Sequence, residues 1–141
     1  MRIFAGVLVA LAAGFVLAAC GGESKQDKAK STVCDARSDI AKQVGSLQGL
    51  TASTVTVAAV STGLKAIGDD LGKIKDAQGD LSDSRKQQVQ SATDTFAASI
   101  KTTLGALGKS VSASSGKADL SAAVQQMAAS YKQAFAPVDC S

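Results

Sequence analysis

The chain has 141 residues, with 15 Lys and Arg against 12 Asp and Glu, and it lacks both histidine and tryptophan. A net charge of +3 without a long basic block disfavours nucleic acid as a partner. The lack of histidine excludes Ser-His-Asp and Cys-His catalytic sites and histidine metal sites, so we expect a protein that is not an enzyme and holds no cofactor.

Residues 1–19 have the pattern of a cleaved signal peptide. Arg2 supplies a positive charge, and Ile3 to Ala19 contains no charged or strongly polar side chain. This run is slightly shorter than the ~20 residues that a spanning helix usually needs, and a polar segment follows it directly. Removal of residues 1–19 would leave 122 residues, which is enough for one domain with its own core.

The run Leu17-Ala18-Ala19-Cys20 resembles the lipobox of bacterial lipoproteins. In that class, a transferase attaches diacylglycerol to the cysteine thiol, and signal peptidase II then cuts just before the cysteine. The resemblance covers only this first segment. It implies lipidation of Cys20 and anchoring to a bacterial membrane on the extracytoplasmic side, in the cell envelope. Gly21 resembles the pattern that is sorted to the outer membrane where a cell has two membranes. The alternative is an ordinary signal peptide cut at the same site.

The lipobox also bears on the other two cysteines. If Cys20 carries lipid, Cys34 and Cys140 remain, and they would form a disulfide in an oxidising compartment. Closing that loop of roughly 107 residues would stabilise the fold by about 4 to 5 kcal/mol on the chain-entropy estimate.

Residues 20–31 are polar and charged without an apolar face, so we expect a flexible tether there and a folded domain over residues 32–141. From Thr32 to Gly49 the apolar residues recur every three or four positions, as in an amphipathic helix. Thr32 is a suitable N-cap with Asp35 three residues later, and Gly49 is a natural stop.

Three more helices are predicted by the same spacing. The second is expected over about residues 53–78, although residues 54–57 alone also fit a short strand. The third follows the break at residues 79–83, and a small-residue loop at 112–116 precedes the fourth, which ends before Pro137. Their predicted buried stripes are Val57, Val60, Leu64, Ile67, Leu71 and Ile74; Val89, Ala92, Phe96, Ile100, Leu104, Leu107 and Val111; and Leu120, Val124, Met127, Tyr131 and Phe135.

Four helices with short connections predict an all-α, up-down-up-down four-helix bundle. In such a bundle the first helix begins where the last one ends. Cys34 and Cys140 then lie at the same end, whereas three helices would separate them by far more than the ~7 Å between Cα atoms that a disulfide tolerates.

Two groups of side chains suggest chemistry, and both have a simpler explanation. The acidic residues Asp69, Asp70, Asp76, Asp80 and Asp83 lack the order of a calcium-binding loop and alternate with basic residues, which favours a solvated, mutually compensating face. Met127, Tyr131 and Phe135 could line a ligand slot, but their spacing is that of a core stripe. We therefore expect no catalytic and no metal-binding residues.

Charge is absent from Leu47 to Leu64, and between Thr102 and Gly116 only Lys109 is charged. In the predicted bundle these segments meet at the end away from the tether, where small uncharged side chains would suit a partner interface or form a charge-poor tip with no partner. The leading hypothesis is therefore a protein that binds another envelope protein or has a structural role. The alternative is a module for a small apolar or lipid ligand, which would require a void lined by Phe96, Ile100, Met127 and Tyr131.

Overall fold

A computed structural model describes residues 24–110 and 115–141 of the chain. These residues form α1 (Lys25–Gln48), α2 (Val57–Ala77), the short 3-10 helix η1 (Gln78–Asp80), α3 (Asp83–Ser110) and α4 (Gly116–Phe135). No strand occurs among them, which confirms the prediction of an all-α protein. The predicted signal peptide, Cys20 and Val111 lie outside the described residues.

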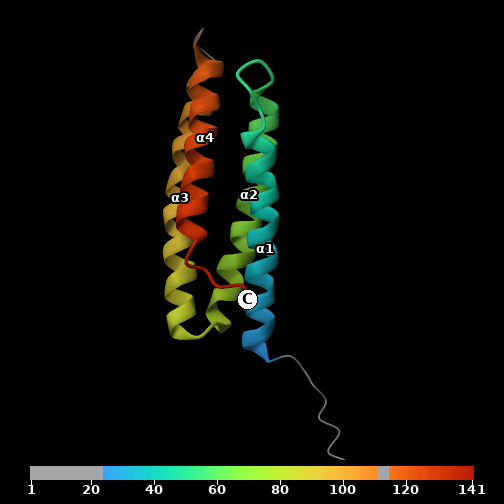
Figure 1. Ribbon diagram of the computed structural model, residues 1–141, viewed down its shortest axis with the longest axis vertical. Coiled ribbons are helices and arrows are strands. Elements are labelled where there is room, and N and C mark those ends of the chain that lie inside the picture. The colour runs from blue at the N-terminus through green and yellow to red at the C-terminus, as the bar shows by residue number, and fades with distance from the viewer. Residues whose placement is uncertain (1–23, 111–114) are drawn as a thin grey trace, which may run out of the picture.

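The four helices lie side by side along the long axis of the molecule (Figure 1). The most extensive packing joins α1 to α2 and α3 to α4, while α1 also contacts α4 and α2 contacts α3. The turn between α2 and α3 lies at one end, and the connection between α1 and α2 lies at the other (Figure 1). The fold therefore consists of two closely packed helix pairs, α1–α2 and α3–α4, which also contact each other.

The core is built from the inner faces of all four helices. Its side chains recur at helical spacing, which explains why the sequence pattern located most of them. The largest of the fully buried side chains are Phe96, Phe135, Ile40, Ile67, Ile74, Leu120 and Met127.

Helix α1 begins at Lys25, seven residues before the predicted start, so the second half of the expected flexible tether is helical. The hydroxyl of Ser24 accepts a hydrogen bond from the Asp27 backbone N–H at 3.1 Å and caps the helix. Ala29 is buried and extends the apolar stripe by one more turn. The N-cap is therefore Ser24 rather than Thr32.

Helix α2 begins at Val57, later than predicted, because Thr56 caps it through its side chain. The preceding residues 51–55 form a turn in which the backbone N–H of Val55 donates to the Thr51 carbonyl at 2.8 Å. Val55 is buried and Val57 is 41% exposed, so the prediction that Val57 belongs to the buried stripe is wrong.

Helix α3 departs from the prediction in its last turns. Leu104 is 48% exposed, whereas the neighbouring Thr103 is buried. The Thr103 hydroxyl donates to the Ser99 carbonyl at 3.1 Å and lies 3.4 Å from the Ala123 carbonyl of α4, so its burial leaves no polar atom unpaired. Leu104 therefore does not belong to the core stripe.

The segment after α4 returns the chain to α1. Helix α4 ends at Phe135, two residues before Pro137, as predicted. The sulfur atoms of Cys34 and Cys140 are 2.14 Å apart, and the two Cα atoms are 5.6 Å apart. The two cysteines that the sequence predicts to pair therefore lie at disulfide distance.

Candidate interaction surface

Two residues of the acidic group form ion pairs with lysines of their own helix, α2. Asp69 pairs with Lys65 at 2.9 Å, and Asp70 pairs with Lys73 at 2.5 Å. Asp70 is only 6% exposed, so the prediction of a solvated acidic face is wrong for this residue. The hydrogen bond from the Lys73 ammonium to Asp70 raises the pKa of Lys73. In the described ranges, no three His, Cys, Asp or Glu side chains are grouped so that they could hold a metal ion.

The aromatic residues of α3 and α4 pack against one another. The ring centroids of Phe96 and Tyr131 are 5.3 Å apart in an edge-to-face arrangement, and those of Phe96 and Phe135 are 5.9 Å apart. The Tyr131 hydroxyl donates to the Arg37 carbonyl of α1 at 2.7 Å, and burial raises the pKa of Tyr131 above its usual value. Aromatic rings therefore fill the place where a ligand void was considered.

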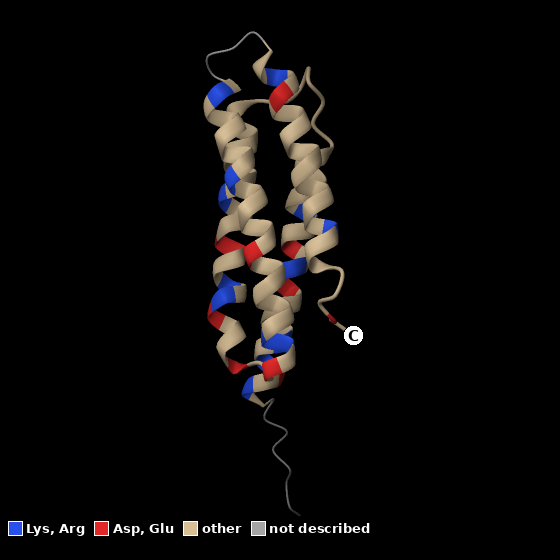
Figure 2. Cartoon of the chain, turned by 90° about the vertical axis from the view of Figure 1, so that its left-hand side faces the viewer, with Lys and Arg blue, Asp and Glu red and all other residues tan. Residues whose placement is uncertain are grey.

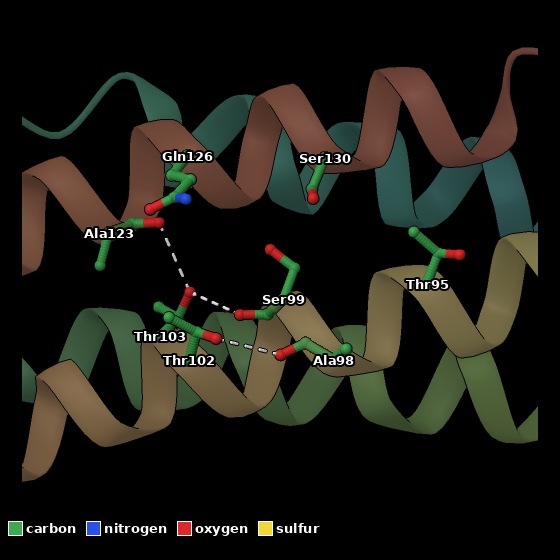
Figure 3. A pocket seen from close by; sticks show the side chains of 8 residues that line it. All are labelled: Thr95, Ala98, Ser99, Thr102, Thr103, Ala123, Gln126 and Ser130. Atoms are coloured by element: carbon green, nitrogen blue, oxygen red, sulfur yellow. Dashed lines mark hydrogen bonds between the residues drawn. The ribbon is translucent and has the colours of Figure 1, made fainter.

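A groove runs along the outer side of the α3–α4 pair. Its first part has a volume of about 230 Å³ and lies between the middle of α3 and the middle of α4 (Figure 3). Its second part, of about 480 Å³, shares Thr95 with the first and continues toward Pro137. We call the two parts together the α3/α4 groove. Its lining residues are Gln87, Gln88, Ser91, Ala92, Thr95, Ala98, Ser99, Thr102, Thr103, Ala123, Gln126, Ser130, Gln133, Ala134 and Pro137.

Every residue that lines the α3/α4 groove is uncharged. The side chains of Ser99 and Ser130 project into it from opposite helices (Figure 3). The Thr102 hydroxyl donates a hydrogen bond to the Ala98 carbonyl of the same helix at 3.3 Å, so it is not a free donor in the groove. The exposed charged residues Asp94 and Lys101 of α3 do not line it. The groove thus offers small groups and side-chain amides without charges that would need to be desolvated.

A second uncharged hollow lies between α1 and α2. It has a volume of about 390 Å³ and is lined by Gln43, Ser46, Leu47, Leu50, Ala58, Ala59, Thr62 and Gly63. Most of these residues belong to the charge-free segment from Leu47 to Leu64, so the sequence did locate this surface.

The end of the molecule away from the disulfide is poor in charge but not free of it. Figure 2 shows many charged positions toward the end where α1 begins and a few at the opposite end. Lys109 lies in the last turn of α3, and Lys117 and Asp119 lie near the start of α4. The uncharged surface is therefore a set of grooves on the sides of the helix pairs rather than the tip alone.

Contiguous charge-free segments of the sequence do not mark the α3/α4 groove, because Asp94 and Lys101 interrupt its lining residues along the chain. The signal was periodic: Ser91, Thr95, Ala98 and Thr102 share one side of a helix while charged residues alternate with them along the chain. The distribution of charge around each helix face therefore carries the signal for this groove.

No family model, no curated protein and no solved structure matches the chain. In the described part of the molecule, none of the helices has an apolar stretch long enough to cross a membrane.

Proposed function

We propose that the chain is a lipoprotein of the bacterial cell envelope whose helical domain binds another envelope protein through the α3/α4 groove and catalyses no reaction. The observation that carries this proposal is the absence of charge from every residue that lines the groove. The centres of protein interfaces are depleted of charged residues, because each buried charge must lose its hydration. A solvated face with no partner has no such constraint.

The anchoring part of the proposal rests on the sequence. A positive residue, an apolar run, small residues and Cys20 occur in the order that lipoprotein signals require. The anchor would hold the domain at the extracytoplasmic face of a membrane, which is the outer membrane if the cell has two. Replacing Cys20 with alanine should abolish incorporation of a labelled fatty acid and leave an uncut precursor. Continued labelling of this variant would contradict the lipobox assignment.

We also propose an up-down-up-down four-helix bundle as the architecture. Two observations support it: each helix packs against its neighbours in the order α1, α2, α3, α4, and Cys140 returns to Cys34 on α1. The bundle presents two outer grooves on long, regular helices, a surface on which the helix of a partner could lie.

The proposal of a non-enzymatic role is supported by the partners of the titratable groups. The Asp70 carboxylate binds a lysine of its own helix, and the Tyr131 hydroxyl donates to a backbone carbonyl. Neither group is left unpaired in a pocket, where a shifted pKa would point to catalysis.

Site-specific photocrosslinking in intact cells tests the interface. A photoreactive residue at Thr95 or Thr102, inside the groove, should crosslink to a defined partner, whereas the same residue at Gln90, exposed on α3 outside the groove, should not. Thr95→Lys should abolish the crosslink from position 102, because it places a charge in the contact, and Gln90→Lys should leave it unchanged.

The outcomes separate the proposals. Equal crosslinking from positions 90, 95 and 102, or a crosslink that survives Thr95→Lys, would contradict a groove-mediated interaction. A lipid or small apolar molecule that copurifies in a fixed ratio with the protein would instead favour the ligand-binding alternative.

A further inference from the structure

The segment after α4 forms a strap that crosses to α1 (Figure 1). We call residues 136–141 the C-terminal strap. Cys140 joins it to Cys34. The Arg37 guanidinium of α1 donates to the Val138 carbonyl at 2.9 Å, and the Lys30 ammonium donates to the backbone oxygen of Ser141. The strap therefore closes the α1–α4 side of the molecule near the start of α1.

The noncovalent attachment of this strap is slight. Val138 is buried, with 3% of its surface exposed, while residues 136, 137 and 139–141 are exposed. The nearest nitrogen of Arg85 lies 3.9 Å from the Asp139 carboxylate, and such exposed ion pairs contribute little. Ordering six residues has a large entropic cost, and the noncovalent contacts that oppose it are one buried valine, one part-buried hydrogen bond from Arg37 and exposed hydrogen bonds. The disulfide favours the ordered strap, because it reduces the conformational freedom that residues 136–141 would otherwise gain on leaving α1.

The two cysteines of the disulfide lie at the surface. Cys140 is exposed and Cys34 is partly exposed. Both line a surface hollow of about 280 Å³ together with Asp27, Lys30, Ser31 and Asp35. Thiol–disulfide exchange requires access of the attacking sulfur along the S–S axis, and an exposed disulfide gives such access without unfolding.

The helical core does not depend on the strap. All of the largest fully buried side chains except Val55 lie on helices, and the strap adds only Val138 to the core. The bond from the Tyr131 hydroxyl to the Arg37 carbonyl joins α4 to α1 directly and does not involve the strap. Release of the strap therefore leaves the four helices packed.

We propose that the Cys34–Cys140 disulfide is a redox-sensitive latch, and that reduction by a dithiol releases the C-terminal strap while the helices remain packed. One thiolate of the reductant forms a mixed disulfide with one protein sulfur, and the other protein sulfur leaves as a thiolate and takes up a proton. The second thiol of the reductant then displaces the first protein sulfur, so that the protein gains two thiols and the reductant becomes a disulfide. Release uncovers the Val138 site and frees the Arg37 guanidinium at the α1–α4 seam. This inference is independent of the proposed partner groove.

Backbone ¹⁵N relaxation of the purified full chain before and after addition of excess dithiothreitol tests the latch. In the oxidised protein, the amides of residues 138–141 should be as rigid as those of the helices. After reduction, their order parameters should fall below about 0.6 while the helical residues keep their values. The rate of reduction should rise in proportion to the dithiothreitol concentration, because the disulfide is attacked in the folded state.

Two variants serve as controls. The double variant Cys34→Ser/Cys140→Ser should have a mobile strap under all conditions, and oxidised Val138→Ala should keep a rigid strap because the disulfide is intact. A strap that stays rigid in the double variant would overturn the proposal, as would loss of the helical signals on reduction. A reduction rate that reaches a plateau at the rate of global unfolding would overturn it as well.

Discussion

Glycines within the helices give the sharpest test of the packing. Gly68, Gly72, Gly105 and Gly108 lie within helices, and a Cβ atom built on any of them would meet no other atom within 4 Å. Gly63 is different, because its Cβ would lie 2.8 Å from the side chain of Leu47 on α1. Alanine should therefore be favourable at these four positions and unfavourable at Gly63.

The magnitudes follow from helix propensity and packing. Glycine is about 1 kcal/mol less favourable than alanine in a helix interior, and compatible Gly→Ala changes gain roughly 0.4 to 1 kcal/mol in stability. These four changes together should raise the free energy of unfolding by about 2 to 4 kcal/mol, because helix propensity contributes at each position. Gly63→Ala must displace the buried Leu47 side chain, and overpacking of this kind costs about 1 to 3 kcal/mol.

Urea unfolding followed by circular dichroism at 222 nm measures both effects. The fourfold variant should unfold at a higher urea concentration and melt roughly 10 °C higher than the parent protein. Gly63→Ala is the matched control, because it makes the same chemical change within the same helix as Gly68→Ala. Equal stabilisation by these two variants would refute the close approach of α1 and α2 at Gly63, and destabilisation by the fourfold variant would refute the open surroundings of the other glycines.

Three further predictions concern the disulfide, the core and the single tyrosine. The double variant Cys34→Ser/Cys140→Ser should lose roughly 2 to 5 kcal/mol of stability in urea unfolding and keep its helical content, and free reaction of both thiols in the folded parent would contradict this. Phe96→Ala should lose about 3 to 5 kcal/mol in the same assay, because Phe96 is fully buried against two other aromatic rings, and a loss below 1 kcal/mol would argue against that packing. Tyr131 has a pKa raised above 10.0 by burial, so the stability that its neutral form provides is complete below pH 10 and is lost as pH rises through the folded-state pKa. Absorbance titration of this only tyrosine should show that raised pKa, and Tyr131→Phe should weaken the alkaline loss of stability while removing the bond to the Arg37 carbonyl.

The sequence was most informative where apolar residues recur regularly. The stripe from Val60 to Ile74 is buried in α2 as predicted, and so is the stripe from Leu120 to Phe135 in α4. Hydrophobic burial is the largest favourable term in folding, so its periodicity dominates the pattern that a sequence presents. The position of Pro137 after α4 was predictable for a local reason, because the residue before a proline disfavours the helical conformation.

The helix boundaries and the ends of the stripes were less predictable because small or polar residues decide them. Ala29 extends the α1 stripe, although an isolated alanine in a charged segment is a weak hydrophobic signal. The buried position after Ile100 in the α3 stripe could be Thr103 or Leu104, and the higher hydropathy of leucine favours Leu104. Thr103 is buried instead because two backbone carbonyls lie within reach of its hydroxyl, and one of them belongs to α4. A single sequence does not reveal such a partner on another helix.

The α3/α4 groove was also difficult to predict from the sequence. Charge along the linear sequence hides it, because Asp94 and Lys101 alternate along the chain with residues that line it but do not line it themselves. The rotation of about 100° per residue separates these charges from Ser91, Thr95, Ala98 and Thr102, which share one side of α3. Between Gln87 and Thr103 only Asp94 and Lys101 are charged, and their spacing of seven residues places both on one side of α3. The partner helix α4 has an uncharged side facing the same groove, with Gln126, Ser130 and Gln133. The proposed contact with another molecule accounts for both uncharged sides meeting in one groove, whereas solubility alone favours charge on exposed surfaces.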